Sequence, residues 1–143
     1  MTQPTHLFFY GVLQEGLGPD GGDWPFLKGL SMGAPATTQG ALYAIPYGDE
    51  WFPALILTQA RYSTIVHGMI HEAGHVDMGP VDEFEGDSYT RQPIPVDGWD
   101  GYGDTEADAY IWTDDLPEGA VPIPDGNFAW WLEANGRKAY SGG

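Results

Sequence analysis

Cysteine is absent from the sequence, and cationic residues are few. The absence of cysteine excludes disulfide bonds, thiolate zinc sites and a cysteine nucleophile, and it is compatible with a reducing compartment. Lys and Arg together number 5, against 21 Asp and Glu residues, for a net charge of -16. Because so acidic a surface repels nucleic-acid phosphates and anionic membranes, we expect neither as a partner.

Long apolar runs are missing as well. No stretch approaches the roughly 18 apolar residues of a membrane-spanning helix. The N-terminus also lacks the basic region and the apolar run of a signal peptide. We therefore expect a cytoplasmic protein that is soluble in water.

Aromatic residues, glycine and proline are abundant. With 6 Trp, 8 Tyr and 6 Phe among 42% hydrophobic residues, the chain has enough apolar material for a core. The 21 Gly and 12 Pro imply many turns, which suits short strands better than a helical bundle. A length of 143 residues is typical of one domain, so we expect residues 1–143 to form a single domain.

Short apolar or alternating segments bounded by turn residues predict strands at residues 6–10, 40–48, 53–58, 89–96 and 106–113. Residues 125–136 carry helix signals, with Asp125 as the expected N-cap and Gly136 as the stop. The stretches 17–25 and 96–108, rich in Gly, Pro and Asp, are expected to be long loops. We predict an α+β fold: a small mixed β-barrel or twisted sheet with a few short helices.

The letters HEAGH, from His71 to His75, match the H-E-x-x-H signature of zinc peptidases. That motif needs a helix, because only there do two His four positions apart reach one metal while the Glu activates its water. The spacing of Val66, Met69, Ile70 and Ala73 fits an amphipathic helix. Gly68, Gly74 and the β-branched run Thr64–Val66 favour a strand. Periodicity leaves open a zinc hydrolase that uses His71, Glu72 and His75.

The segment LFFYGVLQEG joins a strand to a glycine loop at Tyr10 and Gly11. Backbone N–H groups in such a loop can converge on an anion, and a glycine lets that anion approach the backbone closely. This arrangement suits a carboxylate or a developing oxyanion. The plainer interpretation is a strand followed by a turn.

The segment GPVDEFEGDSYTRQPIPV combines carboxylates with a strand pattern. Four acidic residues crowd within six positions: Asp82, Glu83, Glu85 and Asp87. On the strand that follows, Tyr89 and Arg91 are two positions apart and would share a face. Alone, this pattern is more typical of a solvated acidic turn, with Asp82 as a capping residue.

Taken together, YGVL at residues 10–13 and VDEFEGDSYTR at residues 81–91 resemble the gamma-glutamylcyclotransferase-like (AIG2-like) family. That family has a YGSL-type loop and a later LD-x-(F/Y)-E-G-x-x-Y-x-R segment. The segments GALYAIPYGDEWFPALIL, VHGMIHEAG and ADAYIW resemble its intervening and later strands, in order. The resemblance implies that the segment from Val66 is a strand, which leaves HEAGH at a strand end and the following turn.

By this resemblance, Glu85 is the general acid and base, and the substrate loop is Tyr10, Gly11, Val12 and Leu13. The implied reaction is intramolecular: the α-amine of a γ-glutamyl compound attacks its own γ-carbonyl and releases 5-oxoproline and an amine. It requires no metal and no organic cofactor. The implied partner is therefore a small γ-glutamyl substrate, with the protein a monomer or a homodimer.

Three residues near this site have alternative interpretations. Tyr89 is a candidate for a hydrogen bond to the substrate, but its ring could simply pack. Arg91 is a candidate for holding an anionic substrate, although an ordinary ion pair explains it as well. Val12 stands where the family has Ser or Thr, which favours the alternative of a non-catalytic binding module on the same fold.

Overall fold

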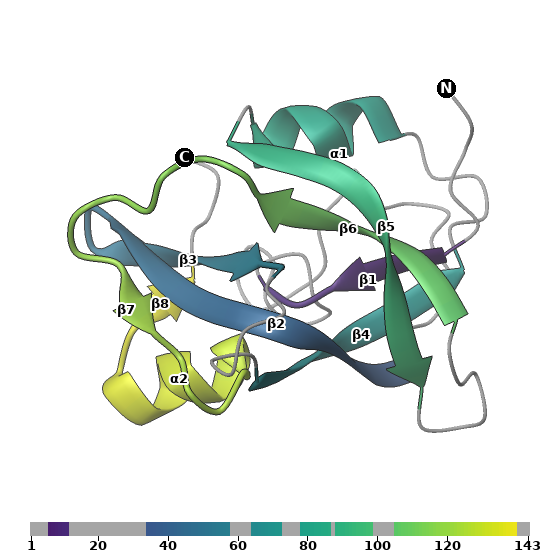
Figure 1. Ribbon diagram of the computed structural model, residues 1–143. Helices are drawn as coiled ribbons and strands as arrows, with labels where there is room; N and C mark the ends of the chain where they lie inside the picture. Colours follow the sequence, from purple (N-terminus) through teal and green to yellow (C-terminus); the bar gives the residue numbers. More distant parts are fainter. Residues whose placement is uncertain are drawn as a thin grey trace.

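The computed structural model describes residues 6–11, 34–57, 64–72, 78–86, 88–98 and 105–139. Figure 1 shows its elements, which are β1 (His6–Phe9), β2 (Ala34–Tyr47), β3 (Glu50–Ile56), β4 (Thr64–Glu72), α1 (Met78–Glu85), β5 (Tyr89–Gly98), β6 (Thr105–Trp112), β7 (Val121–Pro122), α2 (Phe128–Asn135) and β8 (Lys138–Ala139). Of the helices in these ranges, none is long and apolar enough to cross a membrane.

Five of the strands close into a barrel. Hydrogen-bonded neighbours follow the order β4, β1, β6, β5 and β2, and β2 pairs with β4 to complete the ring. The β1–β6 pair is parallel, whereas the other pairs in the ring are antiparallel. Closure removes the free strand edges that an open sheet would expose. The prediction of an α+β fold with a small mixed β-barrel and a few short helices is confirmed.

The long strand β2 joins the barrel to a smaller second sheet. Its first half, Ala34–Gly40, pairs with β4, and its second half, Ala41–Tyr47, pairs with β3. Short strands β7 and β8 extend the second sheet beside β2 and β3. Where β2 changes partner, a Cβ on Gly40 would lie 2.7 Å from Leu55 Cδ1. The absence of a side chain at Gly40 therefore allows β3 to approach.

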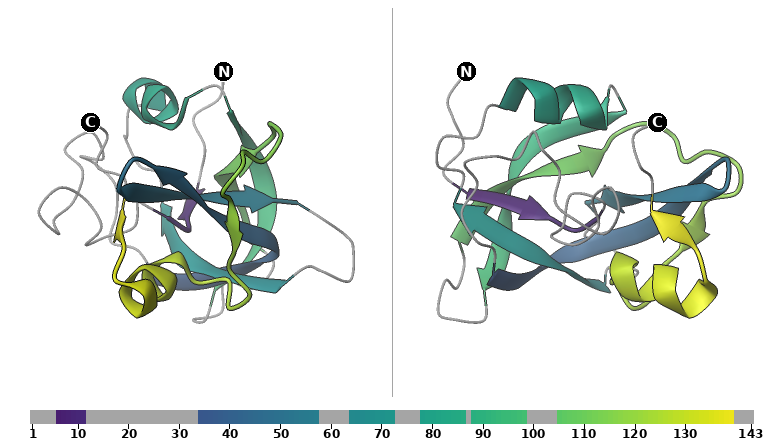
Figure 2. Two further views of the ribbon diagram at one scale, coloured as in Figure 1. Left: turned by 90° about the vertical axis from the view of Figure 1, so that its left-hand side faces the viewer. Right: turned by 180° about the vertical axis from the view of Figure 1, so that it is seen from behind.

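The core fills the barrel and reaches both helices. Its largest fully buried apolar side chains are Phe8, Phe128, Leu7, Leu55, Ile94, Val66, Val81 and Val96. Full burial of such a side chain contributes about 1.5–3 kcal/mol relative to exposure. Helix α1 adds Met78 and Val81 to the core, and α2 adds Phe128 and Leu132. Figures 1 and 2 show the two helices on opposite sides of the barrel.

The strand predictions are confirmed with shifted ends. The predicted segments 6–10, 40–48, 53–58, 89–96 and 106–113 are found as β1, the second half of β2, β3, β5 and β6. Strand β5 extends to Gly98 and β6 begins at Thr105, so the loop expected over residues 96–108 is shorter than predicted. The loop expected at 17–25 lies outside the described residues.

Helix α2 ends as predicted but does not begin as predicted. Its N-cap is Asn127, not Asp125, and the Asn127 side chain accepts a hydrogen bond from the Trp130 backbone N–H at 3.1 Å. The preceding turn is held on the barrel, because an N–H of β4 donates to the Gly126 carbonyl at 2.7 Å. The helix therefore begins only after that turn. Gly136 terminates it in the left-handed conformation, with φ of 61°.

The acidic segment that was expected to be a solvated turn forms helix α1. Pro80 lies in the first turn, where a missing N–H costs no helical hydrogen bond. Val81 is fully buried in the core, and Gly86 follows the helix with φ of 83°, a conformation that ends helices. Asp82 therefore lies inside a helix and does not cap a turn.

Candidate functional site

The first two residues of the HEAGH motif, His71 and Glu72, lie at the end of strand β4. His71 is buried, and its ring lies 5.6 Å from that of Phe9, whereas Glu72 is exposed. Neighbouring residues on a strand point to opposite faces, so this backbone does not present the motif as a helix would. In the described ranges, no three metal-ligating side chains gather. His75 lies outside the described residues, and the strand interpretation of residues 64–71 is confirmed.

Tyr10 and Gly11 lie at the end of β1, where three strands meet. Tyr10 is buried, and its hydroxyl donates to the Tyr110 carbonyl and accepts from the Leu55 N–H at 3.3 Å. A Cβ on Gly11 would lie 2.0 Å from Pro53 Cγ, so packing against Pro53 requires a glycine here. The structure thus fixes the entrance of the predicted substrate loop, whereas Val12 and Leu13 lie outside the described residues.

Tyr89 contacts the backbone of the same proline. Its hydroxyl donates a hydrogen bond to the Pro53 carbonyl. Its half-buried ring packs edge-on against Trp112 at 5.1 Å and against Phe52 at 6.5 Å. Pro53 therefore brings together Gly11, at the start of the predicted substrate loop, and Tyr89, four residues after Glu85.

Arg91 forms the ion pair that was its alternative interpretation. Its guanidinium donates from Nε to Asp82 Oδ1 at 2.9 Å and from Nη1 to Asp108 Oδ2 at 3.0 Å. Burial lowers the pKa of Arg91, but the hydrogen bond and charge of Asp82, with Tyr110 and Asp108, raise it further, so it lies above its ordinary value. Only 11% of the Arg91 side chain is exposed, which leaves little of it for a ligand.

Glu85 is the last residue of α1. Three positions before it, Asp82 accepts a hydrogen bond from the Tyr110 hydroxyl at 2.5 Å and, through its carbonyl, one from the Gly86 N–H at 3.1 Å. The backbone on both sides of Glu85 is thus held in place. The side chains of Glu85 and Phe84 lie outside what the structure describes, as does Asp87, so the catalytic role of Glu85 stays a prediction.

The sequence matches the family model described as gamma-glutamyl cyclotransferase, AIG2-like, over residues 7–131. The chain belongs to this family. The cyclotransferase match spans the loop at residues 10–13, helix α1 and strand β5, so it includes every residue that the sequence predicts for the site. A search of curated proteins by sequence finds no significant match.

Three solved structures place the fold among known ones. YkqA from Bacillus subtilis superposes with a TM-score of 0.66 at 18% identity over 93% of this chain and 42% of that one. An AIG2-like protein from Mus musculus gives 0.60 at 20% identity over 82% of each chain. The K. lactis urea amidolyase gives 0.72 at 15% identity over 92% of this chain and 8% of that one. The chain thus spans less than half of two of these proteins, and identities this low establish the cyclotransferase fold alone.

Three residues that contact the predicted site residues were not identified from the sequence. Pro53 lies in the segment GALYAIPYGDEWFPALIL, and Asp108 and Tyr110 lie in ADAYIW. The signal was the period of two in a strand, which puts Asp108 and Tyr110 on one face of β6. Arg91 pairs in register with Tyr110. Recognising this cluster required the β5–β6 register, which the sequence alone does not determine.

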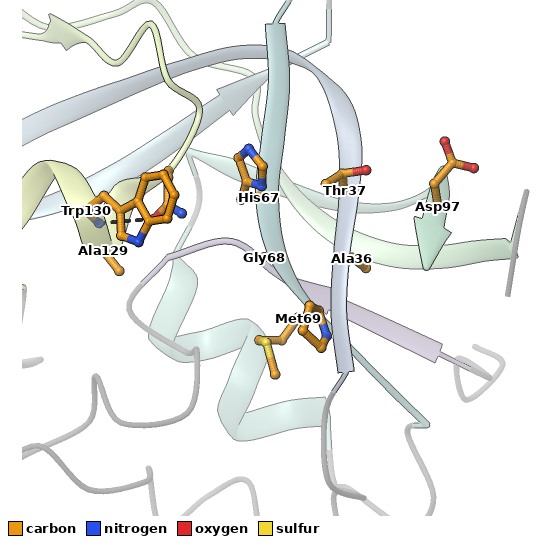
Figure 3. Close-up of a pocket in the computed structure, with 10 residues that line it drawn as sticks. Ala36, Thr37, His67, Gly68, Met69, Asp97, Ala129 and Trp130 are labelled. Atoms are coloured by element: carbon orange, nitrogen blue, oxygen red, sulfur yellow. Dashed lines mark hydrogen bonds between the residues drawn. The ribbon is translucent and has the colours of Figure 1, made fainter. Parts of the chain in front are cut away.

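A groove of about 490 Å³ lies away from this site, between β2, β4, the end of β5 and α2. Figure 3 shows Trp130 and His67 on one side and Asp97 on the other, and the Trp130 and His67 rings stack at 6.2 Å. Tyr89 and Asp97 lie eight residues apart on β5, about 26 Å along a strand. No residue predicted for the cyclotransferase site lines this groove.

Proposed function

We propose that the protein is a γ-glutamylcyclotransferase-type enzyme, which converts a γ-glutamyl amine or peptide into 5-oxoproline and a free amine. The observation that best supports this proposal is the position of Pro53 between Gly11 and Tyr89. Through it, the entrance of the loop at residues 10–13 meets the strand that follows Glu85. Family membership supports the same reaction class.

The proposed reaction needs orientation more than it needs a strong nucleophile. The α-amine nitrogen attacks the γ-carbonyl carbon and forms the new ring bond, and collapse of the tetrahedral intermediate breaks the original amide C–N bond. Because nucleophile and electrophile belong to one molecule, a pocket that folds the glutamyl chain supplies much of the rate. Backbone N–H groups of residues 10–13 would stabilise the oxyanion.

Glu85 would carry the proton in this reaction. As a base it takes a proton from the attacking nitrogen, and as an acid it gives that proton to the leaving amine, so it ends in its starting state. A carboxylate with its ordinary pKa of about 4.3 is a weak base. The proposed role therefore requires a pKa for Glu85 above this value.

Val12 favours a second candidate function, that of a binding module without turnover. The family's hydroxyl at this position would contact the substrate, and valine provides none. In this case γ-glutamyl compounds would stabilise the protein but would not be consumed. The two functions therefore differ in a measurable product.

The test is release of 5-oxoproline, measured by liquid chromatography and mass spectrometry. The panel comprises γ-glutamyl dipeptides, γ-glutamyl alkylamines and γ-glutamyl-ε-lysine, each incubated with purified protein. Glu85→Gln should abolish release while circular dichroism stays native. Glu83→Gln is the matched control, because Glu83 is an exposed carboxylate on the same helix, and it should retain activity. Activity that survives Glu85→Gln would contradict the mechanism.

If no compound of the panel gives 5-oxoproline, the enzyme proposal is contradicted. If a γ-glutamyl compound then raises the melting temperature, the binding module is supported. If none does, both proposals for the loop at residues 10–13 are wrong.

A further inference from the structure

The carboxylate of Asp82 connects helix α1 to strands β5 and β6. Arg91 donates to both of its oxygens, at 2.9 Å from Nε and at 3.3 Å from Nη2, and the Tyr110 hydroxyl donates at 2.5 Å. Charge-assisted, bidentate hydrogen bonds of this kind fix orientation as well as distance. The guanidinium is itself held in place, because its Nη1 donates to Asp108 on β6.

The same residue anchors the end of the helix through its backbone. The Asp82 carbonyl accepts the N–H of Gly86 at 3.1 Å, which closes the last turn around Glu85. Among the side chains that the structure describes in α1, the buried ones, Met78 and Val81, lie in the first half of the helix. In the described part of the chain, Asp82 is therefore what attaches the second half of α1 to the barrel.

Tyr110 connects this anchor to the other half of the site. Its hydroxyl holds Asp82, while its backbone carbonyl accepts the hydrogen bond of the Tyr10 hydroxyl. Tyr110 is buried in the core, whereas the side chain of Asp82 is 37% exposed. One residue of β6 thus touches both the entrance of the loop at residues 10–13 and the helix that ends at Glu85.

We infer that Asp82, Arg91 and Tyr110 are positioning residues: they hold the last turn of α1, which ends at Glu85, in place relative to Tyr10. This inference rests on the proposed role of Glu85. In this inference the guanidinium of Arg91 binds the carboxylate of Asp82 and does not bind the substrate. Loss of the network should lower kcat and leave KM nearly unchanged, because these side chains set the geometry of the reacting group and do not bind the ground state.

The decisive comparison is between the two carboxylates of Arg91. Asp82→Asn and Asp108→Asn each remove one charge partner at nearly the same distance, but only Asp82 lies on α1. We expect Asp82→Asn to lower kcat by about tenfold or more with KM within about twofold, since a misplacement of about 1 Å can cost a hundredfold. Asp108→Asn should change kcat by less than about threefold. An equal loss of kcat in both variants, or a rise in KM alone, overturns the inference.

Tyr110→Phe provides a second variant in case Asp82→Asn does not fold. It removes only the hydroxyl and keeps the buried ring and the carbonyl that holds Tyr10. We expect it to lower kcat in the same manner, with a native circular dichroism spectrum. A Tyr110→Phe protein with the kcat of the wild type would overturn the role of Tyr110.

Amide hydrogen exchange tests the anchor without using activity. By NMR, the Gly86 amide should exchange several-fold faster in Asp82→Asn and Tyr110→Phe than in wild type, and Asp108→Asn should leave it unchanged. An unchanged Gly86 rate in the first two variants overturns the inference. Glu85→Gln, measured alongside, separates the two proposals: if that variant keeps activity, the proposed function fails, whereas the exchange comparison still decides whether the network anchors α1.

Discussion

The hydroxyl of Tyr89 donates a hydrogen bond to the backbone carbonyl of Pro53. This contact ties the start of β5 to β3 at the point where Pro53 also packs against Gly11. Because the bond uses the hydroxyl and the packing uses the ring, the two contributions of Tyr89 can be separated by one substitution.

Tyr89→Phe should lower kcat/KM by roughly three- to thirtyfold and change the free energy of unfolding by only about 0.5–1.5 kcal/mol, the net contribution of one hydrogen bond. The remaining ring still packs against Trp112. Steady-state kinetics and urea unfolding measure the two effects. Tyr47→Phe is the control, because Tyr47 is 60% exposed in the β2–β3 hairpin. A Tyr89→Phe protein that loses stability but keeps its full rate would restrict Tyr89 to packing.

The contact between Gly11 and Pro53 predicts a coupled pair of substitutions. A Cβ at Gly11 would lie 2.0 Å from Pro53 Cγ, so Gly11→Ala should lower the free energy of unfolding by about 1–3 kcal/mol through overpacking. Adding Pro53→Ala removes the clashing ring atom and should recover more than about 0.5 kcal/mol of that loss. Chemical denaturation of the four proteins of this cycle provides the measurement. Strictly additive effects would show that the two residues do not press on each other.

The sequence predicted four of the strands because their patterns are local. Alternating apolar residues and flanking turn residues were sufficient for β1, β3, β5 and β6. The apolar spacing from Val66 to Ala73 fitted a helix, whereas Gly68 and Gly74 favoured a strand, and the resemblance to a family decided for the strand. Helix α1 was missed because its eight residues are rich in acids, and only burial of Val81 in the barrel shows why they are helical.

The site was predictable in its parts but not in its connections. Tyr10, Gly11, Tyr89 and Arg91 were identified from motifs. The structure connects Gly11 with Tyr89 through Pro53, and Tyr10 with Arg91 through Tyr110 and Asp82. The contacts between them run through residues on other strands, at sequence separations of 45 to 100 residues for the Tyr10 hydroxyl. Such separations depend on strand order and register, which no local pattern determines.

The ion pairs of Arg91 should contribute to the free energy of unfolding by an amount that does not change with pH near neutrality. Replacing it in Arg91→Met leaves Asp82 and Asp108 without their cation, and because these carboxylates are partly exposed we expect a loss of about 1–3 kcal/mol. The pKa of Arg91 is raised in the folded protein, so its contribution is fully present below its unfolded pKa and is lost only as the pH rises through the still higher folded pKa, far above neutrality. Urea unfolding at pH 7 and pH 9 should therefore give the same difference between wild type and variant. A difference that disappears by pH 9 would contradict this.

The corrected start of α2 gives a matched pair of substitutions. Asn127→Ala removes the side chain that accepts the Trp130 N–H and should lower the free energy of unfolding by about 1 kcal/mol. Asp125→Ala, at the N-cap position expected from sequence, should change it by less than about 0.5 kcal/mol, because Asp125 is exposed. Thermal unfolding of both variants tests the assignment. A larger loss for Asp125→Ala would restore the original prediction.

Val12→Ser tests whether the loop acts through its backbone or through a side chain. If backbone N–H groups hold the substrate, serine should change kcat/KM by less than about threefold, because the groups that stabilise the oxyanion are already present. If the family's hydroxyl matters, one new hydrogen bond should raise kcat/KM by about three- to tenfold, which corresponds to roughly 0.5–1.5 kcal/mol. Val12→Thr keeps the branched shape and adds the hydroxyl, so it separates the hydroxyl from the change of shape. A rise in both variants, measured as 5-oxoproline release, would show that this chain has replaced a substrate contact with an apolar side chain. A rise from no product to measurable product would show further that Val12 alone had converted a catalytic loop into a binding one.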